Sequence, residues 1–168
     1  MKILTVVKDL GKGGTQRAAQ NFCEGYKILG HNSRLYAVNE GGFRGDELER
    51  SGIVVYTNYC RETTTNIEEW SPELIHIHSH DMNPQLVMEL KALLPNAKFV
   101  ETNVFSTLSE YTSVLDRSFQ LSKWCSYLYL SRGGSTEKLR IVPNPNKTQC
   151  FYKASQQEIA AFKKSYHL

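Results

Sequence analysis

Apolar residues along the chain fall into short runs that alternate with longer stretches in which they recur every three or four positions. The short runs are rich in β-branched and aromatic residues, which is typical of strands in a buried sheet. We therefore expect strands at residues 2–7, 33–38, 53–57, 74–78, 97–102, 118–121 and 139–143.

The stretches between these runs predict helices. In the first stretch one helical face carries Ala18, Ala19, Phe22, Cys23, Tyr26 and Leu29. Thr15 is placed to cap this helix and Gly30 to end it. Further helices are expected at 46–51, in part of 61–70, and at 84–94, 123–130 and 155–168. Residues 103–113 show no clear period, so we expect a mobile or partner-binding loop there.

Regular alternation of strands and helices indicates a parallel sheet covered by helices. The expected fold is α/β, a Rossmann-like doubly wound parallel sheet of about seven strands. A length of 168 residues suits one such domain. Because doubly wound sheets bind ligands at the carboxyl ends of their strands, the loops after the strands are the places to look for function.

Charge and composition narrow the class of protein. The formal net charge of +3 comes from 20 basic and 17 acidic residues spread along the chain, so no nucleic-acid partner is expected. The four cysteines are far apart and form no C-x-x-C pair, which favours a reducing compartment over a disulfide scaffold. The first apolar run is too short for a signal peptide, and no segment approaches membrane-spanning length. We expect a cytoplasmic protein.

The first candidate site is the loop that contains Gly11, Lys12, Gly13 and Gly14, directly before the first helix. Glycines in such a turn serve a backbone that takes positive φ or that comes close to another group, often a phosphate. The loop matches neither a dinucleotide fingerprint, because Gln16 stands where a glycine is needed, nor a Walker loop. A tight turn without a ligand is the alternative.

The second candidate is the sequence HIHSH, which places His76, His78 and His80 two residues apart and so on one face of a strand. This spacing admits a metal site, a structural role for His76, or ligand contact from His78 or His80. Further metal ligands are scarce in the sequence, although Asp81 is near.

Nucleophilic catalysis has little support, since no G-x-S-x-G elbow occurs. A third group is aromatic and consists of Trp124, Tyr127 and Tyr129. Basic residues are not interleaved with these side chains, so we expect them to serve helix packing and not to stack on bases.

Taken in order, several motifs resemble the N-terminal domain of GT-B fold glycosyltransferases of family 4, also called glycosyl transferases group 1. The resemblance covers nearly the whole chain. Its segments are LTVVKDLGKGGTQRAAQNF, ILGHNSRLYAV, SPELIHIHSH, KFVETNVFS, SFQLSKWCSYLY, EKLRIVPNPNKTQCF and EIAAFKKSYHL.

The resemblance implies roles for particular residues. Gly13 and Gly14 would form the loop near the donor diphosphate, and Lys12 and Arg17 would add positive charge there. His78 would lie on or near the floor of the cleft. Asn103 stands in the loop where many members carry a histidine that contacts the transferred sugar, and His78 and Asn103 are therefore the candidate catalytic residues.

The resemblance also implies a function. The full enzyme would transfer a hexose from a nucleotide diphosphate sugar to a hydroxyl acceptor, which would be a glycan or a lipid-linked molecule, with retention of configuration and without a metal or other cofactor. Residues 1–168 would be the acceptor-side domain, and the helix at 152–168 would lead to a C-terminal donor-binding domain absent from this chain. This chain alone is expected to be inactive. Peripheral membrane contact is compatible with a lipid-linked acceptor. The alternatives are a stand-alone Rossmann-type nucleotide-binding module and a His-x-His metal hydrolase.

Overall fold

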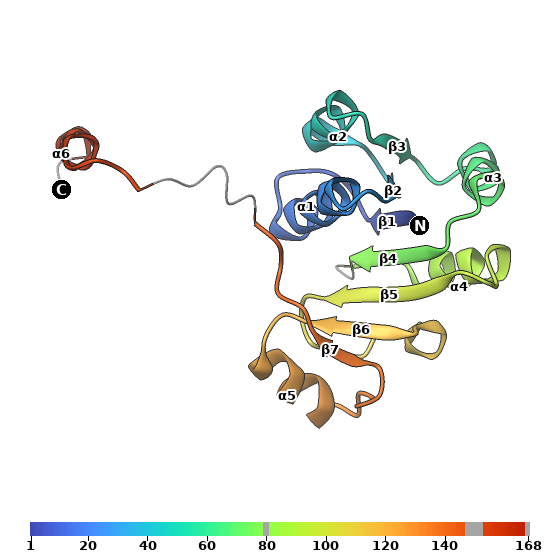
Figure 1. Cartoon of the computed structure of the whole chain (residues 1–168). Coiled ribbons are helices and arrows are strands. Elements are labelled where there is room, and N and C mark those ends of the chain that lie inside the picture. The colour runs from blue at the N-terminus through green and yellow to red at the C-terminus, as the bar shows by residue number, and fades with distance from the viewer. Residues whose placement is uncertain (79–80, 147–152, 167–168) are drawn as a thin grey trace.

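The computed structural model of the chain describes residues 1–78, 81–146 and 153–166. Seven strands form one sheet, and every neighbouring pair is parallel (Figure 1). Their order is β3-β2-β1-β4-β5-β6-β7. The strands are β1 (Lys2–Val7), β2 (Asn32–Ala37), β3 (Val54–Thr57), β4 (Leu74–His78), β5 (Lys98–Asn103), β6 (Arg117–Gln120) and β7 (Leu139–Ile141). The expected doubly wound α/β fold is confirmed.

Helices connect the strands in alternation along the chain. They are α1 (Gly14–Ile28), α2 (Gly42–Arg50), α3 (Arg61–Trp70), α4 (Pro84–Leu93), α5 (Lys123–Ser131) and α6 (Gln156–Ser165), with a short 3₁₀ helix, η1 (Thr112–Val114). The acidic, Thr-rich stretch at 61–70 is helical throughout, although the sequence predicted a loop for part of it. None of the helices in the described ranges is long and apolar enough to cross a membrane.

The helix ends follow local chemistry in most cases. Ser122 accepts a hydrogen bond from Cys125 N at the start of α5, and Ser155 forms a capping box with Glu158 at the start of α6. Gly30, with φ +82°, ends α1 as expected. The prediction that Thr15 caps α1 is wrong, because the helix begins at Gly14 and its N-cap is Gly13.

The two faces of the sheet carry different cores. One face packs mostly against α3 and α4, and its strand residues are Leu4, Val6, Tyr36, Ile75, Ile77 and Phe99. The other face contributes Val7, Leu35 and Ala37 to a smaller core with Cys23 of α1 and Leu48 of α2. Strand alternation therefore sends the histidines of β4 to the α1 side, opposite Ile75 and Ile77.

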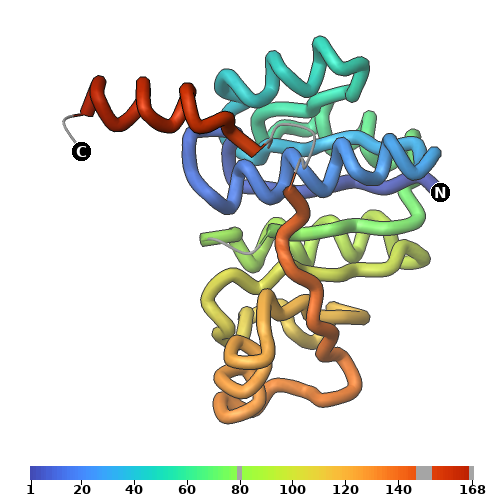
Figure 2. Tube along the Cα trace, turned by 60° about the vertical axis from the view of Figure 1, so that its left-hand side comes forward, coloured from blue at the N-terminus to red at the C-terminus, as the bar shows by residue number. Residues whose placement is uncertain are grey.

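The last helix stands apart from the sheet (Figures 1 and 2). All residues from 153 to 166 are exposed, including the aromatic side chains of Phe162 and Tyr166. The capping box and two lysines in its last turn, Lys163 and Lys164, give α6 local support that does not depend on packing.

Candidate functional site

The strand order reverses between β1 and β4, since the chain continues from β1 to β2 on one side and from β4 to β5 on the other. Loops that follow these two central strands diverge, which leaves the usual ligand crevice of doubly wound sheets. Lys8 follows β1 and Asp81 lies shortly after β4, and their side chains form an ion pair with Nζ and Oδ2 3.6 Å apart. This ion pair lies beyond the carboxyl ends of β1 and β4, where the strand order reverses.

Asp9 stabilises the loop after β1 by hydrogen bonds to residues that follow it. Its Oδ1 accepts hydrogen bonds from the backbone N–H of Gly11 at 2.8 Å and from the side-chain amide of Gln16 at 3.0 Å. Gln16 lies over Gly13, where a Cβ atom would overlap Gln16 Oε1. A side chain at position 13 would therefore displace the end of the flexible Gln16 side chain from the loop.

Arg44 of α2 also hydrogen-bonds to this loop. Its Nε donates to the carbonyl of Gly11 at 2.8 Å, and its Nη1 donates to Gln20 Oε1 at 3.2 Å. The guanidinium is buried, and burial together with the nearby Arg17 lowers its pKa. Sequence reasoning missed this residue, because nothing local in the sequence links Arg44 to a loop 33 positions away.

The exposed side of the loop presents backbone N–H groups. Lys12, Gly13 and Gly14 are exposed, and Gly14 opens α1, where N–H groups lack helical acceptors. Neither Gly13 nor Gly14 is among the glycines with positive φ, so of the two roles expected for glycines in this loop, close approach to another group is the one left for them. No atom lies within 4 Å of a Cβ built on Gly14. Open space at a helix N-terminus suits the close approach of an anion.

Two basic residues named from the sequence lie at this helix start. Lys12 and Arg17 are both exposed. Arg17 extends one turn further along α1 to Gln20, with Nη1 3.3 Å from Oε1. Positive charge therefore accompanies the exposed N–H groups on the first turns of α1.

The β4 histidines lie in a buried layer beneath α1. The Tyr26 hydroxyl and His76 Nδ1 are 2.8 Å apart, and His76 Nε2 and the Thr102 hydroxyl are also 2.8 Å apart. Burial lowers the pKa of His76 to about 3. These two hydrogen bonds support a structural role for His76.

His78 is fully buried, and its ring lies 5.4 Å from that of Phe22, measured between centroids. Neither ring nitrogen has a hydrogen-bond partner among the described residues. Burial, and to a lesser extent the neighbouring His76, holds its pKa well below the usual value. A sugar contact from His78 stays a prediction, and in this conformation Phe22 packs against the ring. His80, the third histidine, lies outside the described residues.

Asn103 ends β5 and is also buried. Its amide donates to Glu101 Oε1 at 3.1 Å and to the carbonyl of Thr107 at 2.6 Å. Glu101 further accepts from the hydroxyls of Ser109 at 2.8 Å and Ser118 at 2.7 Å. Burial raises the pKa of Glu101. The catalytic role of Asn103 stays a prediction, while its observed contacts fasten the loop that follows β5.

The residues named from the sequence therefore gather at one edge. The glycine loop, His78 and Asn103 stand at or just beyond the carboxyl ends of β1, β4 and β5, which are consecutive in the sheet. Within the described residues no group of three or more His, Cys, Asp or Glu side chains could hold a metal ion.

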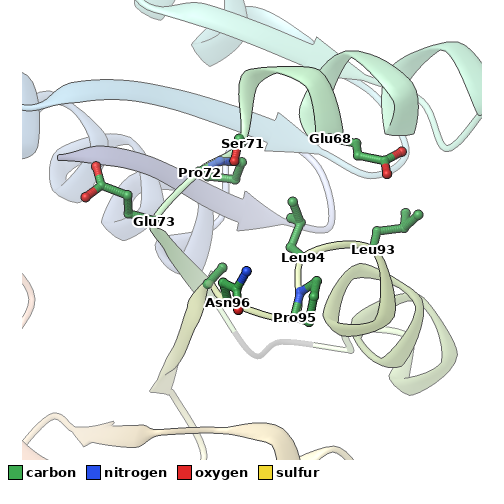
Figure 3. A pocket seen from close by; sticks show the side chains of 9 residues that line it. Glu68, Ser71, Pro72, Glu73, Leu93, Leu94, Pro95 and Asn96 are labelled. Carbon is green, nitrogen blue, oxygen red and sulfur yellow. The ribbon is translucent and has the colours of Figure 1, made fainter.

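A pocket of about 470 Å³ lies at the opposite edge (Figure 3). Ser71, Pro72 and Glu73 line it just before β4, and Leu94 and Pro95 line it just before β5. Glu73 already accepts a hydrogen bond from the backbone nitrogen of Lys2 at 2.7 Å. This pocket is at the amino ends of the strands, away from the switch point, and we do not assign the function to it.

No family model and no curated protein sequence matches this chain. Solved structures do. Anabaena Alr3699/HepE, solved in complex with UDP and glucose, aligns with a TM-score of 0.76 and 14% identity over 99% of this chain and 50% of its own. A glycosyltransferase from Rickettsia africae ESF-5 aligns with a TM-score of 0.76 and 18% identity over 99% of this chain and 49% of its own.

A third similar structure is the lipopolysaccharide outer core galactosyltransferase WaaB in its apo form. It aligns with a TM-score of 0.58 and 12% identity over 87% of this chain and 46% of its own. At identities this low, the structural alignments establish a shared fold. The chain spans about half the length of each of these three structures.

Proposed function

We propose that this chain is the acceptor-side half of a glycosyltransferase that uses a nucleotide diphosphate sugar. The observation that carries the proposal is the alignment of nearly the whole chain with half of Alr3699/HepE, a protein solved with UDP and glucose. The similarity to two further proteins named as transferases supports the same reading.

The loop after β1 is the proposed phosphate-facing element. The N–H groups of Lys12, Gly13 and Gly14 and the positive end of the α1 dipole would stabilise the negative charge that develops on the leaving diphosphate. Lys12 and Arg17 would add charge at the same place. Arg44 and Asp9 both hydrogen-bond to Gly11 in the loop, so the N–H groups need little reorganisation when the ligand arrives.

In the complete enzyme we propose retaining transfer of a hexose to a hydroxyl acceptor, without a metal. The donor would be held mainly by a second domain that follows α6. His78 and Asn103 remain the candidates for contact with the sugar, and either contact would need a shift of the packing seen at these two buried residues.

Titration of the ¹⁵N-labelled chain tests the phosphate role. We expect UDP-glucose and pyrophosphate to bind weakly and to shift the amide signals of Lys12, Gly13 and Gly14, with little change at the remote Glu68 and Asn96 of the amino-end pocket. Tight binding of NAD or NADP through the same loop would instead establish a stand-alone Rossmann-type module. No shift in the loop with any of these ligands would overturn the phosphate role.

A second experiment addresses transfer itself. If the coding sequence continues past Leu168 into another α/β domain, release of UDP from UDP-sugars is measured for the longer protein and for the 168-residue chain. We expect turnover only from the longer protein. Absence of turnover with a panel of nucleotide sugars and acceptors would contradict the proposal.

A further inference from the structure

Five large apolar side chains are exposed at one corner of the molecule. We define the apolar corner as Phe105 and Leu108, 58% and 43% exposed, from the loop after β5, together with Trp124, Tyr127 and Leu130, 66%, 62% and 39% exposed, from α5. The three α5 residues are three positions apart and so share one face of the helix. The expectation of helix packing is wrong for Trp124 and Tyr127, which are exposed, whereas Tyr129 is fully buried as expected.

The two segments of the apolar corner are joined by hydrogen bonds. Arg132, at the end of α5, donates from Nη1 to the carbonyls of Phe105 at 3.0 Å and Ser106 at 2.8 Å. The Ser106 side chain is buried and bonds to Cys125 of α5. The loop therefore holds Phe105 beside α5.

Within α5, the rings of Trp124 and Tyr127 stack with centroids 5.5 Å apart. The stack orders two large exposed side chains against each other, so they lose less side-chain entropy when they bind a surface. Both rings combine an apolar body with a polar N–H or O–H group, the pattern favoured where apolar and aqueous phases meet.

Charge around the apolar corner favours an anionic partner. From Ser122 to Arg132, the stretch that contains α5, there are two basic residues and no acidic one. Lys123, next to Trp124, and Arg132 are exposed at the two ends of α5. Glu110 is the exposed acidic residue of the loop between β5 and η1.

We propose that the apolar corner binds the surface of a bilayer that contains anionic phospholipids. Exposed aromatic side chains would enter the interfacial region, and the surrounding cations would be attracted to the lipid phosphates. The corner follows the carboxyl ends of β5 and β6, the same edge of the sheet as the glycine loop. If the function proposed above holds, this contact would bring the site to a lipid-linked acceptor, but binding itself does not depend on that function.

Vesicle flotation and tryptophan emission test the surface. The probes are vesicles of phosphatidylcholine alone and of phosphatidylcholine with 30 mol% phosphatidylglycerol, a composition of roughly one anionic lipid in three. The chain has two tryptophans, and Trp70 is only 8% exposed, so a blue shift on binding would report Trp124. We expect flotation and a blue shift with the anionic vesicles, weakened by salt.

A matched pair of double variants locates the contact. Trp124→Ser with Tyr127→Ser should lower the partition coefficient by roughly tenfold or more, because apolar area is lost from the interface. Phe162→Ser with Tyr166→Ser removes another exposed aromatic pair, 57% and 64% exposed with centroids 4.7 Å apart, and should change it little. Thermal unfolding of each variant checks the fold.

Three results would overturn the proposal. The first is no binding to anionic vesicles, and the second is equal binding to both vesicle types. The third is an equal loss in both double variants. Blue-shifted Trp124 emission without vesicles, from self-association or from a longer chain that covers α5, would assign the corner to a protein partner and would likewise overturn it.

Discussion

The imidazole rings of His76 and His78 lie with their centroids 4.6 Å apart, and both side chains are fully buried. They project from the same face of β4 into the layer beneath α1. Burial keeps both rings neutral, with the pKa of His76 at about 3 and that of His78 well below its usual value. Two neutral histidines in contact link the stability of the fold to pH.

The first prediction concerns this pH dependence. Below about pH 6.5 the unfolded chain binds protons on both rings while the folded chain does not, so the free energy of unfolding should fall by up to about 1.4 kcal/mol per pH unit for each histidine. The full contribution is present above about pH 6.5 and is lost towards the folded pKa values. Urea unfolding of the wild type and of His78→Phe between about pH 4 and 6 tests this. The change in the free energy of unfolding per pH unit should be smaller in the variant by the contribution of one histidine. Equal slopes would contradict the prediction.

The second prediction concerns the hydroxyl of Tyr26, which lies 2.8 Å from His76 Nδ1. Tyr26→Phe would leave a buried ring nitrogen without its partner and should lower the free energy of unfolding by about 1–3 kcal/mol. Tyr127→Phe is the matched control, because Tyr127 is 62% exposed, and it should change stability by less than about 0.5 kcal/mol. Urea unfolding at neutral pH measures both. If Tyr26→Phe lowers the free energy of unfolding no more than the control does, this hydrogen bond contributes little to stability.

The third prediction compares two glycines. Gly42 has φ +60°, and a Cβ atom there would stand 2.8 Å from the carbonyl oxygen of Leu10, so Gly42→Ala should destabilise by more than about 1 kcal/mol. Gly25 lies in α1 with nothing within 4 Å of its Cβ position, and Gly25→Ala should stabilise by about 0.5–1 kcal/mol. Chemical denaturation of the two variants measures whether each substitution raises or lowers the free energy of unfolding. If Gly42→Ala leaves stability unchanged, the start of α2 does not constrain the loop after β1.

The fourth prediction separates ligand approach from folding at the glycine loop. Because Gly14 has open space and ordinary backbone angles, Gly14→Val should fold with nearly unchanged stability, yet its side chain would stand where a phosphate is proposed to approach. Pyrophosphate titration should show at least roughly tenfold weaker binding than the wild type. Lys12→Ala, which removes one exposed charge but keeps the N–H groups, should weaken binding less. Wild-type affinity in Gly14→Val would place the phosphate elsewhere.

Much of the fold could be predicted from the sequence because its signals are local. The predicted strand at 74–78 coincides with β4, and Pro84, Ser122 and Ser155 stand at helix starts as their chemistry suggests. Strand runs, caps and turn glycines depend on residues within a few positions of one another. Thr15 shows the limit of this reasoning, since a suitable cap residue was present and the helix is nevertheless capped two residues earlier, by Gly13.

The sequence by itself determined the alternation of strands and helices, and so a parallel doubly wound sheet with its loops of interest at the carboxyl edge. Only the tertiary structure decided which of those side chains face a ligand. It buried His78 beneath Phe22, bound Asn103 to Glu101, placed Arg44 against the loop before α1, and left Trp124 and Tyr127 exposed. The reason is physical: periodicity identifies the apolar face of an element, but what covers that face depends on contacts between segments that lie far apart in the chain.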